Sequence, residues 1–109
     1  MKILFLTLKK APFEVMATGE KNQEFRAPSK WVKSRLFDKN GCAKKYDAVK
    51  FVNGYGAKLP YFIAEYKEVY QINCDKTIKY SNNLIVYVKK GDYVIRLGNI
   101  IETGNLESE

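Results

Sequence analysis

The 109-residue sequence contains no histidine, only two cysteines and three prolines, and no long apolar run. Without histidine, Ser-His-Asp catalysis, Cys-His catalysis and every histidine-containing zinc site are excluded. Cys42 and Cys74 are too few for a four-cysteine zinc site, and no carboxylate cluster has metal-ligand spacing. We therefore expect no metal and no cofactor. Any catalytic base must then be a carboxylate, or a lysine whose pKa is lowered by burial or by neighbouring positive charge.

The apolar run near the start, residues 3–8, is too short for the core of a signal peptide. It is followed by Lys9-Lys10 rather than by a small-residue cleavage site. No segment approaches the roughly 20 apolar residues needed to cross a bilayer. Two cysteines without a secretory segment are typical of a reducing compartment. We expect a cytoplasmic protein that makes no membrane contact.

Positive charge is in excess and unevenly spread. The net charge is +7, and the last eight residues hold three acids and no base, so residues 1–101 alone carry +10. Between Lys21 and Lys58 there are ten bases against three acids. Such a segment favours polyanions, and RNA or a nucleotide is the expected partner. Lysine-rich surfaces also serve solubility, which is the competing interpretation.

One short stretch combines charges of both signs. Gly19, Lys21, Glu24 and Arg26 form the pattern G-x-K-x-x-E-x-R. Gly19 follows an apolar helical pattern over residues 13–17 and suits the left-handed residue that ends a helix. Residues 24–27 alternate with period two, so Glu24 and Arg26 should project from one face of a strand with Lys21 in the bend before it. On spacing alone, the favoured interpretation is a solvated ion-pair cluster of little energetic worth.

The order of apolar strand, short helix, this motif and a second strand resembles the ASCH superfamily, whose fold is similar to the small β-barrel of PUA domains. The four motif positions are matched by Gly19, Lys21, Glu24 and Arg26. The resemblance implies a cleft that handles RNA, a nucleotide or a nucleoside. Some relatives hydrolyse modified cytidine or RNA. That hydrolase branch has a hydroxyl residue where this chain has Glu24, and it uses a further glutamate.

The remaining pattern predicts an α+β fold: a small PUA-like β-barrel of five to seven strands with two short helices. Residues 1–101 should form a single ASCH-like domain, and residues 102–109 a frayed acidic tail. We expect residues 3–8 to lie centrally in the sheet, and residues 84–88 and 93–97 to form a hairpin. The other expected strands are 24–27, 46–53, 61–73 and 77–80, with helices starting near Pro12 and at Ser29.

These features predict a module that binds RNA or a nucleotide in a basic cleft. Lys21 and Arg26 would contact phosphate, and Glu24 would accept from a base amino group. Aromatic side chains could stack bases, and glutamates on the long strand could complete the cleft or an active site; the candidates are Trp31, Tyr55, Tyr61, Glu65 and Glu68. One alternative is a hydrolase of an acetylated-cytidine type of nucleoside or of RNA phosphodiesters, with Lys21 as base and Glu24 assisting. A second alternative is a protein-interaction module whose basic face meets an acidic partner.

Overall fold

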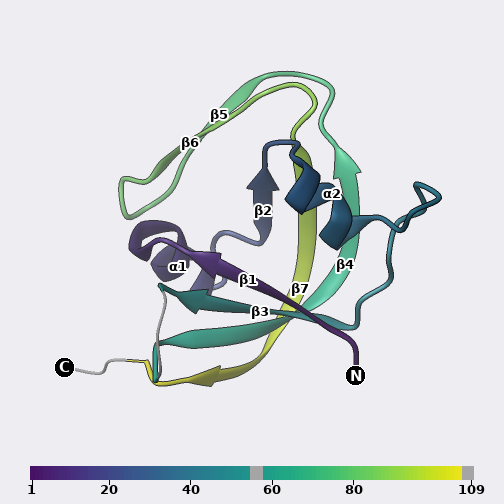
Figure 1. The fold of residues 1–109 in the computed structure, drawn as a ribbon. Coiled ribbons are helices and arrows are strands. Elements are labelled where there is room, and N and C mark those ends of the chain that lie inside the picture. The colour runs from purple at the N-terminus through teal and green to yellow at the C-terminus, as the bar shows by residue number, and fades with distance from the viewer. Residues whose placement is uncertain (55–57, 107–109) are drawn as a thin grey trace.

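The computed structural model describes residues 1–54 and 58–106, and over these it shows a curled five-stranded sheet, two short helices and a separate two-stranded hairpin (Figure 1). The predicted α+β class with a small barrel-like sheet is confirmed, and the PUA-like assignment stays a prediction. The elements in chain order are β1 (Ile3–Leu8), α1 (Lys10–Ala17), β2 (Gln23–Arg26), α2 (Lys30–Leu36), β3 (Ala48–Asn53), β4 (Tyr61–Gln71), β5 (Lys76–Lys79), β6 (Ile85–Val88) and β7 (Tyr93–Gly104).

The sheet order is β1-β3-β4-β7-β2, with β1 parallel to β3 and all other neighbours antiparallel. β1 and β2 are therefore the two edge strands of the sheet. The expectation that residues 3–8 lie centrally, buried on both faces, is wrong: Leu4, Leu6 and Leu8 are buried, whereas Phe5 is 61% exposed. An apolar run is compatible with either position, because one face alone satisfies the core.

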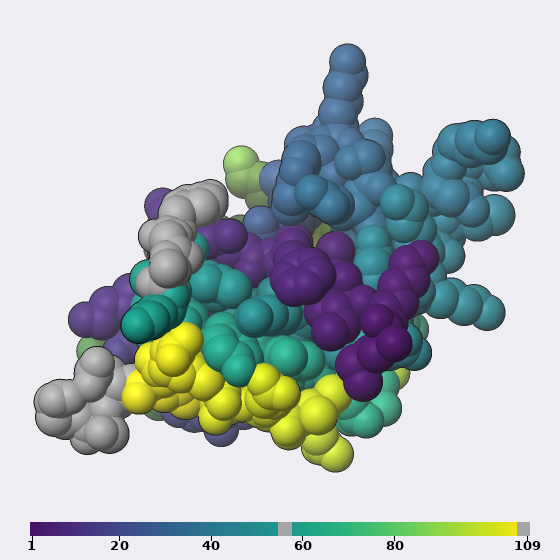
Figure 2. All heavy atoms as spheres, turned by 60° about the horizontal axis from the view of Figure 1, so that its bottom comes forward, coloured from purple at the N-terminus to yellow at the C-terminus, as the bar shows by residue number. Residues whose placement is uncertain are grey.

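The long strand β4 is bent, as its length predicted. Its pairing with β7 shifts register three times, between Ile63 and Glu68. Such irregularities increase local twist and bend the ribbon. The concave face they create encloses one hydrophobic core, in which Phe62 stacks on Phe51 at 5.1 Å between ring centroids and contacts Phe13 at 5.4 Å. Figure 2 shows β7 (yellow) beside β4 (teal), and the α2 region (blue) projecting beyond the sheet.

The two helices begin for different reasons. Ser29 caps α2 as predicted, since its hydroxyl accepts from the Val32 N–H at 3.1 Å. α1 starts at Lys10 with no side-chain cap, and Pro12 lies in its first turn, where a missing N–H is tolerated. α1 is held instead by packing, because Phe13, Val15 and Met16 are buried.

Two sequence-based expectations about the C-terminal half are wrong. β6 pairs with β5 through a turn in which Asn83 is left-handed, so residues 84–88 do not form a hairpin with β7. β7 instead pairs with β4 and β2. Residues 102–104 are also not a frayed tail, since β7 runs to Gly104 and Glu102 pairs with Ile63. Glu107 and Glu109 lie outside the described residues. Alternation identifies a strand but does not identify its partner.

We expect Tyr66→Phe to be neutral or stabilising by up to about 1 kcal/mol near pH 7, because the buried Tyr66 hydroxyl has no hydrogen-bond partner among the described residues. Burial, and to a lesser degree Tyr46, raises the pKa of Tyr66 to about 12 from 10.0. Between these values the unfolded chain has lost a proton that the folded protein keeps, so wild type loses stability as pH rises. Urea unfolding near pH 7 and pH 11 should show that loss in wild type and a smaller one in Tyr66→Phe. A neutral-pH destabilisation above about 1 kcal/mol would contradict this account.

Candidate functional site

The chain reverses at Gly19 and brings Lys21 back beneath α1. Gly19 has φ of 88°, the left-handed conformation predicted for it, and its N–H donates to the Met16 carbonyl at 3.0 Å. The Lys21 N–H then donates to the Val15 carbonyl at 3.3 Å. A side chain at position 19 would meet no atom within 4 Å, so the backbone conformation is what favours glycine there.

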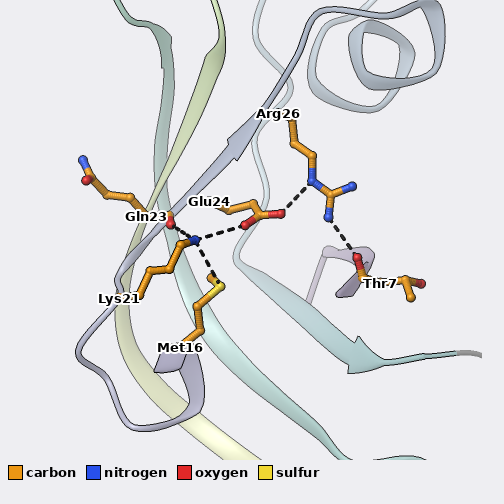
Figure 3. A network of polar contacts seen from close by, with 6 residues as sticks. All are labelled: Thr7, Met16, Lys21, Gln23, Glu24 and Arg26. Atoms are coloured by element: carbon orange, nitrogen blue, oxygen red, sulfur yellow. Dashed lines mark hydrogen bonds and ion pairs between the residues drawn. The ribbon is translucent and has the colours of Figure 1, made fainter. Parts of the chain in front are cut away.

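The Lys21 ammonium group is buried and contacts three acceptors (Figure 3). Its Nζ lies 2.5 Å from the Gln23 carbonyl oxygen, 3.3 Å from Glu24 Oε1 and 3.5 Å from Met16 Sδ. The whole residue is 3% exposed. The three ammonium donors therefore meet three acceptors from α1 and β2.

Glu24 holds a second cation with its other oxygen. Its Oε2 accepts from Arg26 Nε at 2.7 Å, and Glu24 is 5% exposed. Arg26 Nη2 then donates to the Thr7 carbonyl at 3.0 Å. Thr7 belongs to β1 and Arg26 to β2, so this side chain joins the two edge strands of the curled sheet (Figure 3). Lys21, Glu24 and Arg26, here called the motif cluster, are thus not a solvated ion-pair group.

The motif cluster combines two cations with one carboxylate, which leaves one net positive charge. Burial lowers the pKa of Lys21, and Arg26 adds to the lowering, while Glu24 opposes it. The faces of two aromatic rings partly offset the burial of the ammonium: Phe25 at 5.4 Å and Tyr80 at 6.0 Å from Nζ to the ring centroids. Desolvation lowers the pKa of Lys21 and the neighbouring carboxylate raises it, and the effect of desolvation is the larger.

The turn of the β5–β6 hairpin is fastened to α1 beside this cluster. Glu20 accepts hydrogen bonds from both the N–H and the hydroxyl of Ser81, and Asn82 Nδ2 donates to the Ala11 carbonyl at 3.0 Å. The hairpin consequently arches over β2 (Figure 1) and places Tyr80 next to Lys21. No sequence signal linked residues 80–82 to the motif.

A pocket of about 320 Å³ lies on one side of Lys21. We call it the Lys21 pocket. Buried apolar side chains from α1, β4 and β7 border it, polar atoms make up more of its exposed lining, and two asparagines flank it; the residues concerned are Met16, Phe62, Leu97, Asn22 and Asn99. Of the motif, only Gly19 and Lys21 line this pocket. The sequence could not place Phe62, Leu97 or Asn99 here, because their positions depend on the irregular β4–β7 register.

Arg26 faces a different space from Lys21. It lines a crevice of about 10 Å³, together with Trp31 and Arg35 of α2. Trp31 is 48% exposed, and the Arg35 guanidinium lies 5.1 Å from its ring centroid. This crevice has room for about one water molecule. The predicted single cleft is thus divided, with Glu24 between Lys21 and Arg26, and Trp31 belongs to the Arg26 side.

Among the described residues, Glu65, Glu68 and Tyr61 do not line the Lys21 pocket. Glu65 accepts from the Asn99 N–H at 2.8 Å and lies 3.7 Å from Lys67 Nζ. Glu68 pairs with Arg96 at 2.6 Å. The Tyr61 hydroxyl donates to Glu102, and Tyr55 lies outside the described residues. We therefore do not retain Glu65 or Glu68 as pocket residues.

Within residues 1–54 and 58–106, no group of three side chains is suited to hold a metal ion, and no helix is long and apolar enough to span a bilayer. Cys42 and Cys74 are exposed and unpaired. Comparison with known proteins gives no significant match to a family model, a curated protein or a solved structure. The resemblance to the ASCH superfamily therefore depends on the motif and the order of elements.

We expect Lys21→Met to change the pH dependence of stability, because methionine keeps the side-chain length and removes the charge. Burial lowers the pKa of Lys21 below 10.5, so between the lowered value and 10.5 the unfolded chain holds a proton that the folded protein has released. Over that window the unfolding free energy of wild type should rise with pH relative to Lys21→Met, and below it the difference should be constant. Urea unfolding of both proteins at a series of alkaline pH values measures this. If the plots of unfolding free energy against pH stay parallel for the two proteins throughout, the Lys21 pKa is not lowered.

Proposed function

We propose that this protein is an ASCH-type module that binds a nucleoside or nucleotide, free or as one unit of an RNA chain, in the Lys21 pocket. One observation carries the proposal: a buried, net-positive cluster places Lys21 at the wall of a pocket of about 320 Å³ that two amide side chains flank.

The size and lining of the pocket suit one nucleoside. Small-molecule sites typically measure about 300–1,000 Å³, so this pocket is at the lower end of that range. Phe62 and Leu97 are almost fully buried, so the partly exposed Ile100 is the side chain that offers apolar contact to a base. Asn22 and Asn99 each carry a donor and an acceptor that match the edges of an unpaired base.

The electrostatics favour a negatively charged group beside Lys21. The motif cluster retains one positive charge that a phosphate would offset. Of the three acceptors around Nζ, Met16 Sδ is the most distant, at 3.5 Å, and a thioether is a weak acceptor. A phosphate oxygen could replace the sulfur without displacing Gln23 or Glu24, and a charge-assisted hydrogen bond is stronger than the contact it replaces.

A second candidate function is hydrolysis of a modified nucleoside, and the lowered pKa of Lys21 favours it. A neutral Lys21 would act as general base toward a water molecule in the pocket, with Glu24 positioning its amine. In that case the turnover of an N-acylated cytidine should rise with pH through the lowered pKa and disappear in Lys21→Met. Binding without turnover identifies the binding module instead.

The binding proposal is tested by titrating nucleoside 5′-monophosphates into wild type, Lys21→Met and Arg26→Met. Lys21→Met should weaken binding by about tenfold or more, the scale of a charge-assisted hydrogen bond. Arg26→Met removes an equal charge from the same cluster but outside the pocket, so it should weaken binding per folded molecule by less than Lys21→Met does, while lowering stability.

Asn22→Ala gives a second pocket variant at an exposed position, in case Lys21→Met folds poorly. It should also weaken binding. Equal losses in Lys21→Met and Arg26→Met would show a general charge effect rather than a pocket, and no binding by wild type would end the proposal.

A further inference from the structure

A second and larger hollow lies away from the Lys21 pocket. It measures about 1,030 Å³ and is formed by α2, the loop of residues 38–44 that follows it, and the adjoining ends of β4 and β7. We call it the α2 groove. None of the motif residues Gly19, Lys21, Glu24 and Arg26 lines it.

The loop that forms one wall of the α2 groove is held in a defined shape. Asp38 Oδ1 accepts from the backbone N–H groups of Asn40 and Cys42, each at 2.9 Å. Phe37 and Ala43 form an isolated β-bridge, and the Lys44 N–H donates to the Leu36 carbonyl at 2.9 Å. Because these bonds tie both ends of the loop to α2, the groove is a preformed feature.

The charge in the α2 groove is predominantly positive. Lys33, Lys39 and Lys44 line it, and the acid among its lining residues is Asp38, whose carboxylate is engaged by backbone N–H groups. Over the described part of the chain, none of the three lysines forms an ion pair. Lys44 Nζ donates to the Ser34 carbonyl at 2.8 Å, which fixes the ammonium at the wall without neutralising it.

Aromatic rings supply the apolar part of the α2 groove. The partly exposed Phe37 lines it and packs on the ring of Tyr93, which is largely buried beneath, with 5.3 Å between the ring centroids. Cations beside aromatic faces are the combination that single-stranded nucleic acids use, since phosphates meet the cations while bases contact the rings.

We propose that the α2 groove binds a single-stranded RNA segment, with Lys33, Lys39 and Lys44 on its phosphates and Phe37 against a base. The inference rests on the proposed function in taking RNA as the polyanion, and it adds a second site separate from the Lys21 pocket. The volume is over three times that of the Lys21 pocket, so the groove accommodates more than one nucleotide. An acidic peptide is less favoured, because carboxylates are best matched by arginine forks and the cations here are all lysines, which act as point charges for phosphate.

The test is fluorescence anisotropy of a labelled uridine oligonucleotide of about ten residues, titrated at several salt concentrations. In Lys33→Ala/Lys44→Ala, the slope of log affinity against log salt should become shallower by about 1.4, which is about 0.7 for each lost phosphate contact. Affinity at about 0.1 M salt should fall at least fivefold. Lys33→Arg/Lys44→Arg keeps both charges and should keep most of the affinity.

Lys76→Ala/Lys79→Ala on β5 is the matched control, since it removes the same charge at exposed positions outside the α2 groove. It should leave the slope near that of wild type. Equal slopes in wild type and Lys33→Ala/Lys44→Ala, or no binding by wild type, would overturn the inference. A glutamate peptide that displaces the RNA, with an affinity that falls in the same variant, would reassign the groove to acidic partners.

The proposals for the Lys21 pocket and the α2 groove can be tested independently. A nucleoside 5′-monophosphate titration of Lys33→Ala/Lys44→Ala should match wild type, since neither lysine lines the Lys21 pocket. Absent monophosphate binding with a normal oligonucleotide effect would remove the Lys21 pocket alone, and the reverse result would remove the α2 groove alone.

Discussion

The buried carboxylate of Glu24, shared between Lys21 and Arg26, is the interaction on which the arrangement of this protein depends. The sheet order leaves β1 and β2 as edges, and β2 has only four residues with which to hold its place. Through Arg26, Glu24 connects β2 to the Thr7 carbonyl of β1, and through Lys21 it connects β2 to α1. Edge strands lack a pairing partner on one side, and this link joins the two edges of the curled sheet through side chains.

The same interaction accounts for the chemistry available at the Lys21 pocket. Burial disfavours the ammonium form of Lys21 and lowers its pKa. Glu24 stabilises the charged form of Lys21 and Arg26 destabilises it. The motif cluster, with two cations and one carboxylate, has a net charge of one positive. Folding therefore assembles the motif for structural reasons, and the ligand we propose would replace the one weak ammonium contact, to the Met16 sulfur.

The sequence predicted the local features of the site and missed its long-range ones. Glycine preference for left-handed backbone located the end of α1 at Gly19, and period-two alternation placed Glu24 and Arg26 on one face, where they pair at 2.7 Å. The residues that β4 and β7 contribute to the Lys21 pocket could not be predicted, because register shifts in β4 decide where its side chains lie relative to β7. Glu65 was expected in the cleft, but in the irregular β4–β7 pairing its carboxylate accepts a hydrogen bond from the Asn99 N–H. The fastening of Ser81 to Glu20 likewise depends on strand pairing that alternation does not encode.

The most direct test of the structural role of Glu24 is the unfolding free energy of Glu24→Gln, measured in urea near pH 7 beside the control Glu14→Gln. Glutamine keeps the size of the side chain but leaves two largely buried cations without a counter-charge, so a loss of about 3 kcal/mol or more is expected. Glu14 is exposed on α1 and has no ion pair within the described residues, so its variant should stay within about 0.5 kcal/mol of wild type. A Glu24→Gln protein as stable as Glu14→Gln would contradict the account.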